Sequence, residues 1–221
     1  MAKGSNPRIH IIPTVFSTDL KGFKRRLARL EKASPEIQID IMDGKFVKAK
    51  SIPVENIPDL RKKRARFEAH LMMKEPVSLV PALKKKGFDR VIAHIEALNG
   101  KKGVDTYIQE CRKNKIDAGL AIRPETPVSR VKPYLRRIEV LLFLGVHPGK
   151  EGQHLIPGVV RKIASYTEHG YKTSAQIDGG VSLKTAQALA EAGVRRFNTG
   201  AYTAKARSPK RAITALKNSI L

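Results

Sequence analysis

Short β-branched apolar runs alternate regularly with longer amphipathic segments along this chain. A bounded apolar run predicts a buried strand, and apolar residues three and four apart predict a helix. The predicted strands are Ile9–Pro13, Ile37–Ile41, Arg66–Met72, Arg90–His94, Ala118–Ile122, Ile138–Phe143, Ser174–Ile177 and Arg195–Thr199. The predicted helices are Leu20–Glu31, Val54–Leu60, Val77–Lys86, Val104–Lys113, Val128–Tyr134, Gly158–Glu168, Leu183–Ala192 and Pro209–Ser219.

Eight strand–helix units within 221 residues fit few architectures. Strands that alternate with helices form parallel sheets, and eight units with short connections favour a (β/α)8 (TIM) barrel over an open doubly wound sheet. No Gly-x-Gly-x-x-Gly follows the first predicted strand, which argues against a dinucleotide-binding fold. No linker divides the chain, so we expect an α/β protein with one barrel domain over residues 1–221.

Composition limits the class of protein further. Cys111 is the only cysteine, which leaves no intramolecular disulfide and no cysteine-based metal site. No apolar run approaches the roughly 20 residues that a membrane helix needs, and the first residues lack the apolar core of a signal peptide. We therefore expect a cytoplasmic protein that has no membrane partner.

The formal net charge of +23 raises the question of an anionic partner. Its densest clusters are RKKRARF at Arg61–Phe67 and LKKKGF at Leu83–Phe88. Aromatic residues rarely interrupt these clusters, so a solvated surface is favoured over nucleic-acid binding, which stays open as an alternative. Attraction of anionic substrates is a further alternative.

The segment IQIDIMDG at Ile37–Gly44 places polar residues inside an apolar strand. Side chains alternate along a strand, so Gln38, Asp40 and Met42 share one face and the isoleucines share the other. In a barrel the isoleucines would pack against the helices, and Asp40 would point inward near the mouth. A buried ionised carboxylate is costly unless it is paired or metal-bound.

The same alternation directs residues of two other strands into the barrel interior: Glu68, His70 and Met72 from one, and Gln176 and Asp178 from the other. It also sets His94 and Glu96 on one face. Barrel active sites lie at the C-terminal strand ends, so we expect Asp40, His70 and Asp178 to converge there. Two carboxylates and an imidazole can coordinate a divalent cation or act as paired acid and base, and these roles are compatible.

Glycines follow the last three predicted strands, in PGKEGQ at Pro148–Gln153, DGG at Asp178–Gly180 and NTGA at Asn198–Ala201. Loops after the seventh and eighth barrel strands commonly bind phosphate, and glycine lets backbone N–H groups approach an anion closely. Their joint placement predicts a phosphorylated substrate.

Taken together, the motifs resemble those of the ribulose-phosphate 3-epimerase family along nearly the whole chain. The matching stretches are IPTVFSTDL, DIMDGKFV, HLMMKEP, AHIEA, AGLAIRPETP, VHPGKEGQHLIP, QIDGGVSLKTAQALAEAG and NTGA. The resemblance implies an isomerase of the pentose phosphate pathway, which reversibly epimerises D-ribulose 5-phosphate and D-xylulose 5-phosphate at C3. We also expect a homo-oligomer.

The resemblance implies specific roles as well. Asp40 and Asp178 would exchange the C3 proton on opposite faces of an enediolate. A divalent metal (Zn, Fe, Mn or Co) would bind Asp40, His70 and Asp178. The implied substrate contacts are Thr14, Met42, His70, Met72, Gly149, Lys150, Glu151, Gly152, Gly179, Gly180, Gly200 and Ala201.

This chain departs from the family pattern at several positions. Gln38 stands where the family has histidine as a fourth metal ligand, and Gln176 stands where it has glutamate. The chain also has GKEGQ in place of GFGGQ, Ala201 in place of serine, Leu144 in place of methionine and Lys45 in place of histidine. An amide oxygen is a weaker donor than imidazole to zinc-like ions. Gln38 and Gln176 should both lie one layer below the aspartates. We hypothesise that these two neutral amides replace a coupled His and Glu and lower metal affinity about 10–100-fold.

Three alternative functions stay open at this point. The substrate could be another ketose phosphate, such as allulose 6-phosphate. Another barrel isomerase or aldolase is less favoured, because no predicted strand offers an inward lysine for Schiff-base chemistry. The third alternative is a catalytically weakened barrel that binds phosphorylated ligands or nucleic acid.

Overall fold

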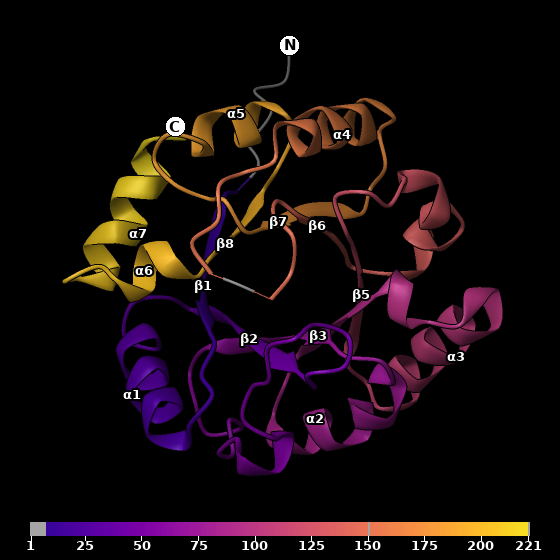
Figure 1. Cartoon of the computed structure of the whole chain (residues 1–221), viewed down its shortest axis with the longest axis horizontal. Coiled ribbons are helices and arrows are strands. Elements are labelled where there is room, and N and C mark those ends of the chain that lie inside the picture. Colours follow the sequence, from indigo (N-terminus) through magenta and orange to yellow (C-terminus); the bar gives the residue numbers. More distant parts are fainter. Residues whose placement is uncertain (1–7, 150, 221) are drawn as a thin grey trace.

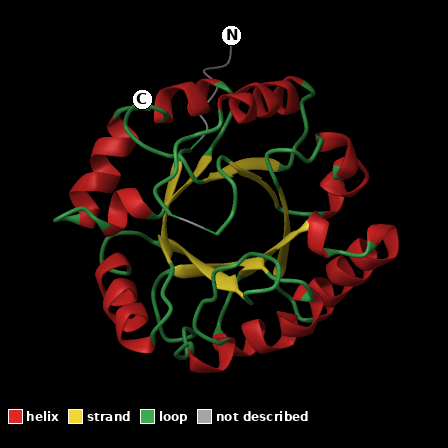
Figure 2. Cartoon of the chain, viewed as in Figure 1, coloured by secondary structure: helices red, strands yellow, loops and turns green. Residues whose placement is uncertain are grey.

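Eight parallel strands close into a barrel in sequence order, with β8 paired to β1, in the computed structural model (Figure 1). The structure describes residues 8–149 and 151–220. The strands are β1 His10–Val15, β2 Glu36–Met42, β3 Arg66–Met72, β4 Arg90–His94, β5 Asp117–Ile122, β6 Val140–Leu144, β7 Ser174–Asp178 and β8 Arg196–Thr199. Helices surround the ring of strands (Figure 2). The predicted TIM barrel is confirmed.

The outer layer consists of α1 Leu20–Leu30, α2 Val80–Lys86, α3 Gly100–Lys113, α4 Pro157–Glu168, α5 Ala186–Glu191, α6 Ala201–Ala204 and α7 Pro209–Asn218. Five 3-10 segments complete the described elements: η1 Val54–Asn56, η2 Pro76–Leu79, η3 Ile95–Ala97, η4 Val128–Arg130 and η5 Lys132–Arg137. The helix α1 illustrates why these segments form. Asp19 caps it by accepting the N–H of Gly22 at 2.7 Å, and Phe23, Leu27 and Leu30 are buried at helical spacing.

Two predicted helices are wrong, and proline explains both. The segment predicted as Val54–Leu60 is a single turn, η1, because Pro58 follows it and cannot continue a helix. The segment predicted as Val128–Tyr134 is divided between η4 and η5, with Pro133 inside it. The helix predicted over Leu183–Ala192 starts later, at Ala186, and α6 was not predicted.

The barrel separates an outer apolar layer from a mixed interior. Ile37, Ile39 and Ile41 of β2 are buried in the core between strands and helices, as the alternation predicted. Inside the barrel, β4 to β6 contribute a smaller apolar cluster of Ile92, Ala121, Val140, Leu142 and Leu144. The other strands, together with His94 at the end of β4, contribute buried polar side chains that position the site.

The basic cluster at residues 61–64 is exposed and directly precedes β3, so it lies at the N-terminal strand ends. That is the end of the barrel opposite the cavity described below. None of the helices formed by residues 8–149 and 151–220 is long and apolar enough to cross a membrane.

Candidate active site

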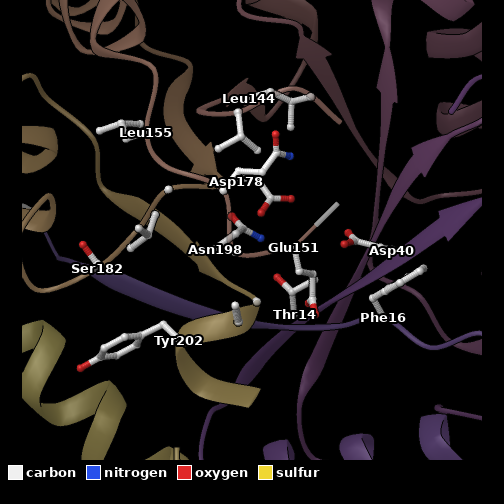
Figure 3. A pocket seen from close by; sticks show the side chains of 18 of the residues that line it. Thr14, Phe16, Asp40, Leu144, Glu151, Leu155, Asp178, Ser182, Asn198 and Tyr202 are labelled. Carbon is white, nitrogen blue, oxygen red and sulfur yellow. The ribbon is translucent and has the colours of Figure 1, made fainter. Parts of the chain in front are cut away.

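A cavity of about 750 Å³ opens at the C-terminal ends of the strands (Figure 3). It is lined by every substrate contact that the family resemblance implies, except Lys150, which lies outside the described residues. Asp40 and Asp178 line it too, and so does Leu144. Gln38 is fully buried two positions before Asp40 on the inward face of β2 and lies beneath the cavity floor.

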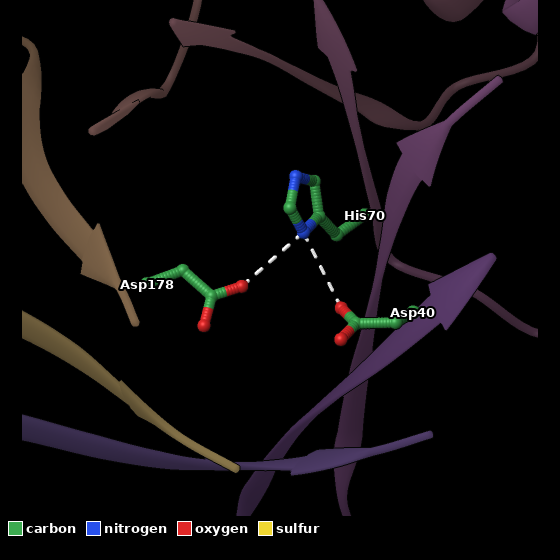
Figure 4. Close-up of side chains that lie close together, drawn as sticks. All are labelled: Asp40, His70 and Asp178. Carbon is green, nitrogen blue, oxygen red and sulfur yellow. Dashed lines mark hydrogen bonds and ion pairs between the residues drawn. The ribbon is translucent and has the colours of Figure 1, made fainter. Parts of the chain in front are cut away.

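The cavity floor carries a cluster of Asp40, His70 and Asp178 from β2, β3 and β7 (Figure 4). Asp40 and His70 are register partners on adjacent strands, whereas Asp178 reaches them from the other side of the interior. His70 Nδ1 lies 3.3 Å from Asp40 Oδ1 and 3.2 Å from Asp178 Oδ2. The convergence that the alternation of side chains predicted is therefore present.

Burial and mutual repulsion alter the electrostatics of this cluster. Burial raises the pKa of Asp40 to about 6, repulsion from Asp178 and Glu151 adds to the rise, and His70 opposes it. Burial disfavours the charged form of His70, but hydrogen bonds to Asp178 and Asp40 outweigh burial and raise its pKa to about 9. A carboxyl group with a pKa near 6 can both accept and donate a proton near neutral pH.

A second histidine fixes the orientation of the His70 ring. His94 Nε2 lies 3.0 Å from His70 Nε2, and His94 Nδ1 lies 3.2 Å from Glu96 Oε2. Burial lowers the pKa of His94 to about 4, so this ring is neutral. Because Glu96 can only accept, His94 Nδ1 carries the proton and His94 Nε2 accepts from His70. His70 Nδ1 is thereby directed at the two aspartates.

The cluster fits a divalent cation at three corners. A tetrahedral ion with bonds of about 2.1 Å sets its ligand atoms roughly 3.4 Å apart, close to the His70–carboxylate distances. Oxygen and imidazole donors suit Zn, Fe, Mn or Co. At the fourth corner, Gln38 directs its amide nitrogen at Asp40 Oδ1 (2.9 Å) and Asp178 Oδ2 (2.7 Å). An amide N–H₂ group has no donor lone pair for a metal.

A buried amide layer lies below the cluster. Gln38 and Gln176 both occupy this layer, as the sequence predicted, but they are joined through Asn198 instead of contacting each other. Glu68 and Arg196 each form a hydrogen bond with Gln176 and contact each other. Asn198 and Arg196 were missed, although the alternation of side chains applied to β8 would have placed both inward.

Glycines and an ion pair shape the rest of the cavity wall. Gly180 has φ +73°, and a Cβ there would lie 2.6 Å from Leu155 Cα, so only glycine fits. Glu151 lines the cavity with its carboxylate paired to Arg26 of α1, at 2.6 Å between Oε1 and Nη2. Among the described residues, Thr14 Oγ1 is one of few buried side-chain polar atoms without a hydrogen-bond partner.

Several lining residues were not among the predicted site residues. Phe16, Ser182 and Tyr202 reach the cavity from loops or from α6 (Figure 3). Ser182 donates its N–H to Thr185 Oγ1 at 2.9 Å, and α5 begins at Ala186. The chain leaves this helical region through Gly193, whose left-handed backbone, φ +101°, suits glycine.

Comparisons with known proteins agree with this geometry. Residues 10–203 match the model of the Ribulose-phosphate 3 epimerase family. Ribulose-phosphate 3-epimerase from Schizosaccharomyces pombe is 29% identical over 216 residues, covering 96% of this chain and 93% of that protein. The enzyme of the same name from Chlamydia trachomatis is 32% identical over 200 residues, covering 87% and 84%. The crystal structure of KGPDC from Streptococcus mutans shares the fold, with TM-score 0.73, 14% identity and coverage of 96% and 97%.

Proposed function

This chain belongs to the ribulose-phosphate 3-epimerase family and functions as an epimerase of that family, and we propose that Asp40 and Asp178 are its two acid–base groups. The observation that carries this proposal is the convergence of both carboxylates on His70 Nδ1, at 3.3 and 3.2 Å. One carboxylate removes the proton from C3 of the ketose phosphate. The other returns a proton to the opposite face, which inverts the configuration.

Each carboxylate has one oxygen held by the protein. Gln38 Nε2 donates to Asp40 Oδ1 and Asp178 Oδ2, and His70 Nδ1 contacts the same two oxygens. In our proposal the second oxygen of each carboxylate, Asp40 Oδ2 and Asp178 Oδ1, exchanges the substrate proton. The raised pKa of Asp40, about 6, supports reversible proton transfer in both directions.

The rest of the cavity supports a substrate with a sugar end and a phosphate end. Met42 and Met72 line the cavity and form an apolar cluster with Val47, which would exclude water from the reacting carbon. The unpartnered hydroxyl of Thr14 is available to a substrate hydroxyl. The glycines Gly179, Gly180 and Gly200 would receive the phosphate through backbone N–H groups.

Asp40, His70 and Asp178 would hold a divalent cation in this proposal. Such a cation would polarise the C2 carbonyl, acidify the C3–H bond and stabilise the enediolate charge. The positions of the two aspartates and of His70 are set by the protein itself, through β2, β3, β7 and the contacts of Gln38 and His94.

A coupled assay with ribulose 5-phosphate tests the proposal directly. Asp40→Asn and Asp178→Asn should each lower kcat at least about 10³-fold, since each removes a positioned acid–base group. A parallel assay with allulose 6-phosphate compares kcat/KM values and identifies the preferred ketose.

The matched control is Asp19→Asn, the same chemical change at the N-cap of α1. Asparagine caps helices about as well as aspartate, so this variant should keep wild-type activity. Near-normal turnover in Asp40→Asn or Asp178→Asn would contradict the assignment of that residue.

A further inference from the structure

A row of buried polar side chains runs beneath the two aspartates from β8 to β2. Arg196 Nε donates to Gln176 Oε1 at 3.0 Å, and Gln176 Nε2 donates to Asn198 Oδ1 at 2.8 Å. Asn198 Nδ2 then donates to Gln38 Oε1 at 2.7 Å. The three amides are almost completely buried, so water does not offer them other partners.

The two ends of this row fix its direction. The guanidinium of Arg196 can only donate, so the oxygen of Gln176 must face it. Glu68 can only accept, and it receives hydrogen bonds from Gln176 Nε2 and from Asn198 Nδ2 (3.2 Å). Turning any one amide would place donor against donor or acceptor against acceptor in a buried site, which is strongly unfavourable.

The last amide therefore presents N–H₂ to the carboxylates. Gln38 uses one hydrogen on Asp40 Oδ1 at 2.9 Å and the other on Asp178 Oδ2 at 2.7 Å. For the oxygen of Gln38 to serve as a metal ligand, Asn198 and Gln176 would both have to turn as well. Gln176 would then direct its N–H₂ group at the guanidinium of Arg196.

We propose that Arg196, acting through Gln176 and Asn198, holds Gln38 as a hydrogen-bond donor to both aspartates, so that any divalent cation is bound through three protein ligands only. Gln38 is then a positioning residue that fixes the two carboxylates. It does not replace the histidine ligand of the family. This inference rests on the proposed roles of Asp40 and Asp178, but its test measures cation binding without substrate.

Co²⁺ binding, followed by calorimetry and by the visible spectrum of the ion, tests the proposal with two variants. Gln38→Met keeps the side-chain volume but removes both amide atoms, so Co²⁺ affinity should stay within about threefold of wild type or become tighter. Asn198→Asp places a carboxylate oxygen against both Gln38 Oε1 and Glu68 Oε1. A proton taken up there lies between this carboxylate and Glu68, so the N–H₂ of Gln38 should turn to the carboxylate and the oxygen of Gln38 should become a ligand. We expect at least about tenfold tighter Co²⁺ binding in Asn198→Asp.

The double variant separates ligation by Gln38 from simple charge. Asn198→Asp also adds a negative charge, which alone would attract the cation. If Gln38 supplies the new ligand, Asn198→Asp should lose its tenfold gain when combined with Gln38→Met. An equal gain in both backgrounds would overturn the proposal.

Gln38→Met alone shows whether Gln38 ligates the cation, even if Asn198→Asp fails to fold. A loss of tenfold or more in Co²⁺ affinity in Gln38→Met would show that Gln38 ligates the cation and would overturn the proposal. Loss of epimerase activity in Asp40→Asn and Asp178→Asn remains a separate outcome, so failure of this inference leaves the acid–base assignment standing.

Discussion

The two halves of the barrel interior differ in what holds them together. Strands β4 to β6 contribute the apolar cluster of Ile92, Ala121, Val140, Leu142 and Leu144, beside the buried His94 at the end of β4. The half formed by β2, β3, β7 and β8 is filled by Gln38, Glu68, His70, Gln176, Arg196 and Asn198, all buried. The halves meet between β6 and β7, where Leu142 is the register partner of Gln176 and Leu144 that of Asp178.

The two halves should therefore differ in how well they tolerate substitutions. An apolar half depends on volume and shape, and similar apolar side chains can replace one another there. A buried polar half depends on every partner, because one missing group leaves others without hydrogen bonds. The chemistry lies on the polar half, where the same network that stabilises the interior also orients the two aspartates.

Removing the shared acceptor of the polar half should have the largest effect on stability. Glu68 accepts from Arg90 at 3.1 Å and from Arg196 at 3.3 Å, besides its amide partners. Glu68→Leu leaves Arg196 with Glu36 and Arg90 with Asp117 (3.7 Å) as their remaining charge partners. It also removes the acceptor of two buried amide groups, so it should lower the free energy of unfolding by about 3–5 kcal/mol. Urea denaturation measures this, with the exposed Glu139→Leu as control for the lost charge. Equal losses in both variants would contradict the special role of Glu68.

Gln176 and Leu142, register partners where the two halves meet, allow the halves to be compared with the same replacement residue. Gln176→Met removes partners from Arg196 and Asn198 and should lower the free energy of unfolding by about 3 kcal/mol. Leu142, the register partner of Gln176 on β6, can also be replaced by methionine. Leu142→Met should lower the free energy of unfolding by less than about 1.5 kcal/mol. Thermal unfolding of both variants compares the two losses in the free energy of unfolding. A larger loss in Leu142→Met than in Gln176→Met would contradict the proposed difference between the two halves.

The apolar half should respond to added volume. A Cβ on Gly119 would lie 2.8 Å from Val140 Cγ2 and 2.9 Å from Ile92 Cγ1, both inside the barrel. Gly119→Ala should therefore lower the free energy of unfolding by about 1–3 kcal/mol through overpacking. Combining it with Ile92→Val, which removes a methyl group at the contact, should recover part of that loss. No recovery would mean that the strain lies elsewhere.

The sequence predicted the strands and the inward aspartates because both follow from local alternation. It predicted the helices less well where Pro58 and Pro133 interrupt apolar patterns that resemble helices. The direction of Gln38 could not be predicted, because it depends on Asn198 of β8, which donates to Gln38, and on Arg196, which acts through Gln176. The Arg26–Glu151 pair was equally inaccessible, since it joins α1 to a distant loop.

Deuterium exchange at C3 tests the paired action of Asp40 and Asp178 most directly. Each variant, Asp40→Asn and Asp178→Asn, is incubated in D₂O with ribulose 5-phosphate or xylulose 5-phosphate, and NMR follows both exchange and inversion. We predict that inversion falls at least about 10³-fold in both variants. Each variant should still exchange the C3 hydrogen of one epimer, and the two variants should exchange opposite epimers. Exchange of the same epimer by both variants, or inversion near the wild-type rate in either, would contradict the two-aspartate account.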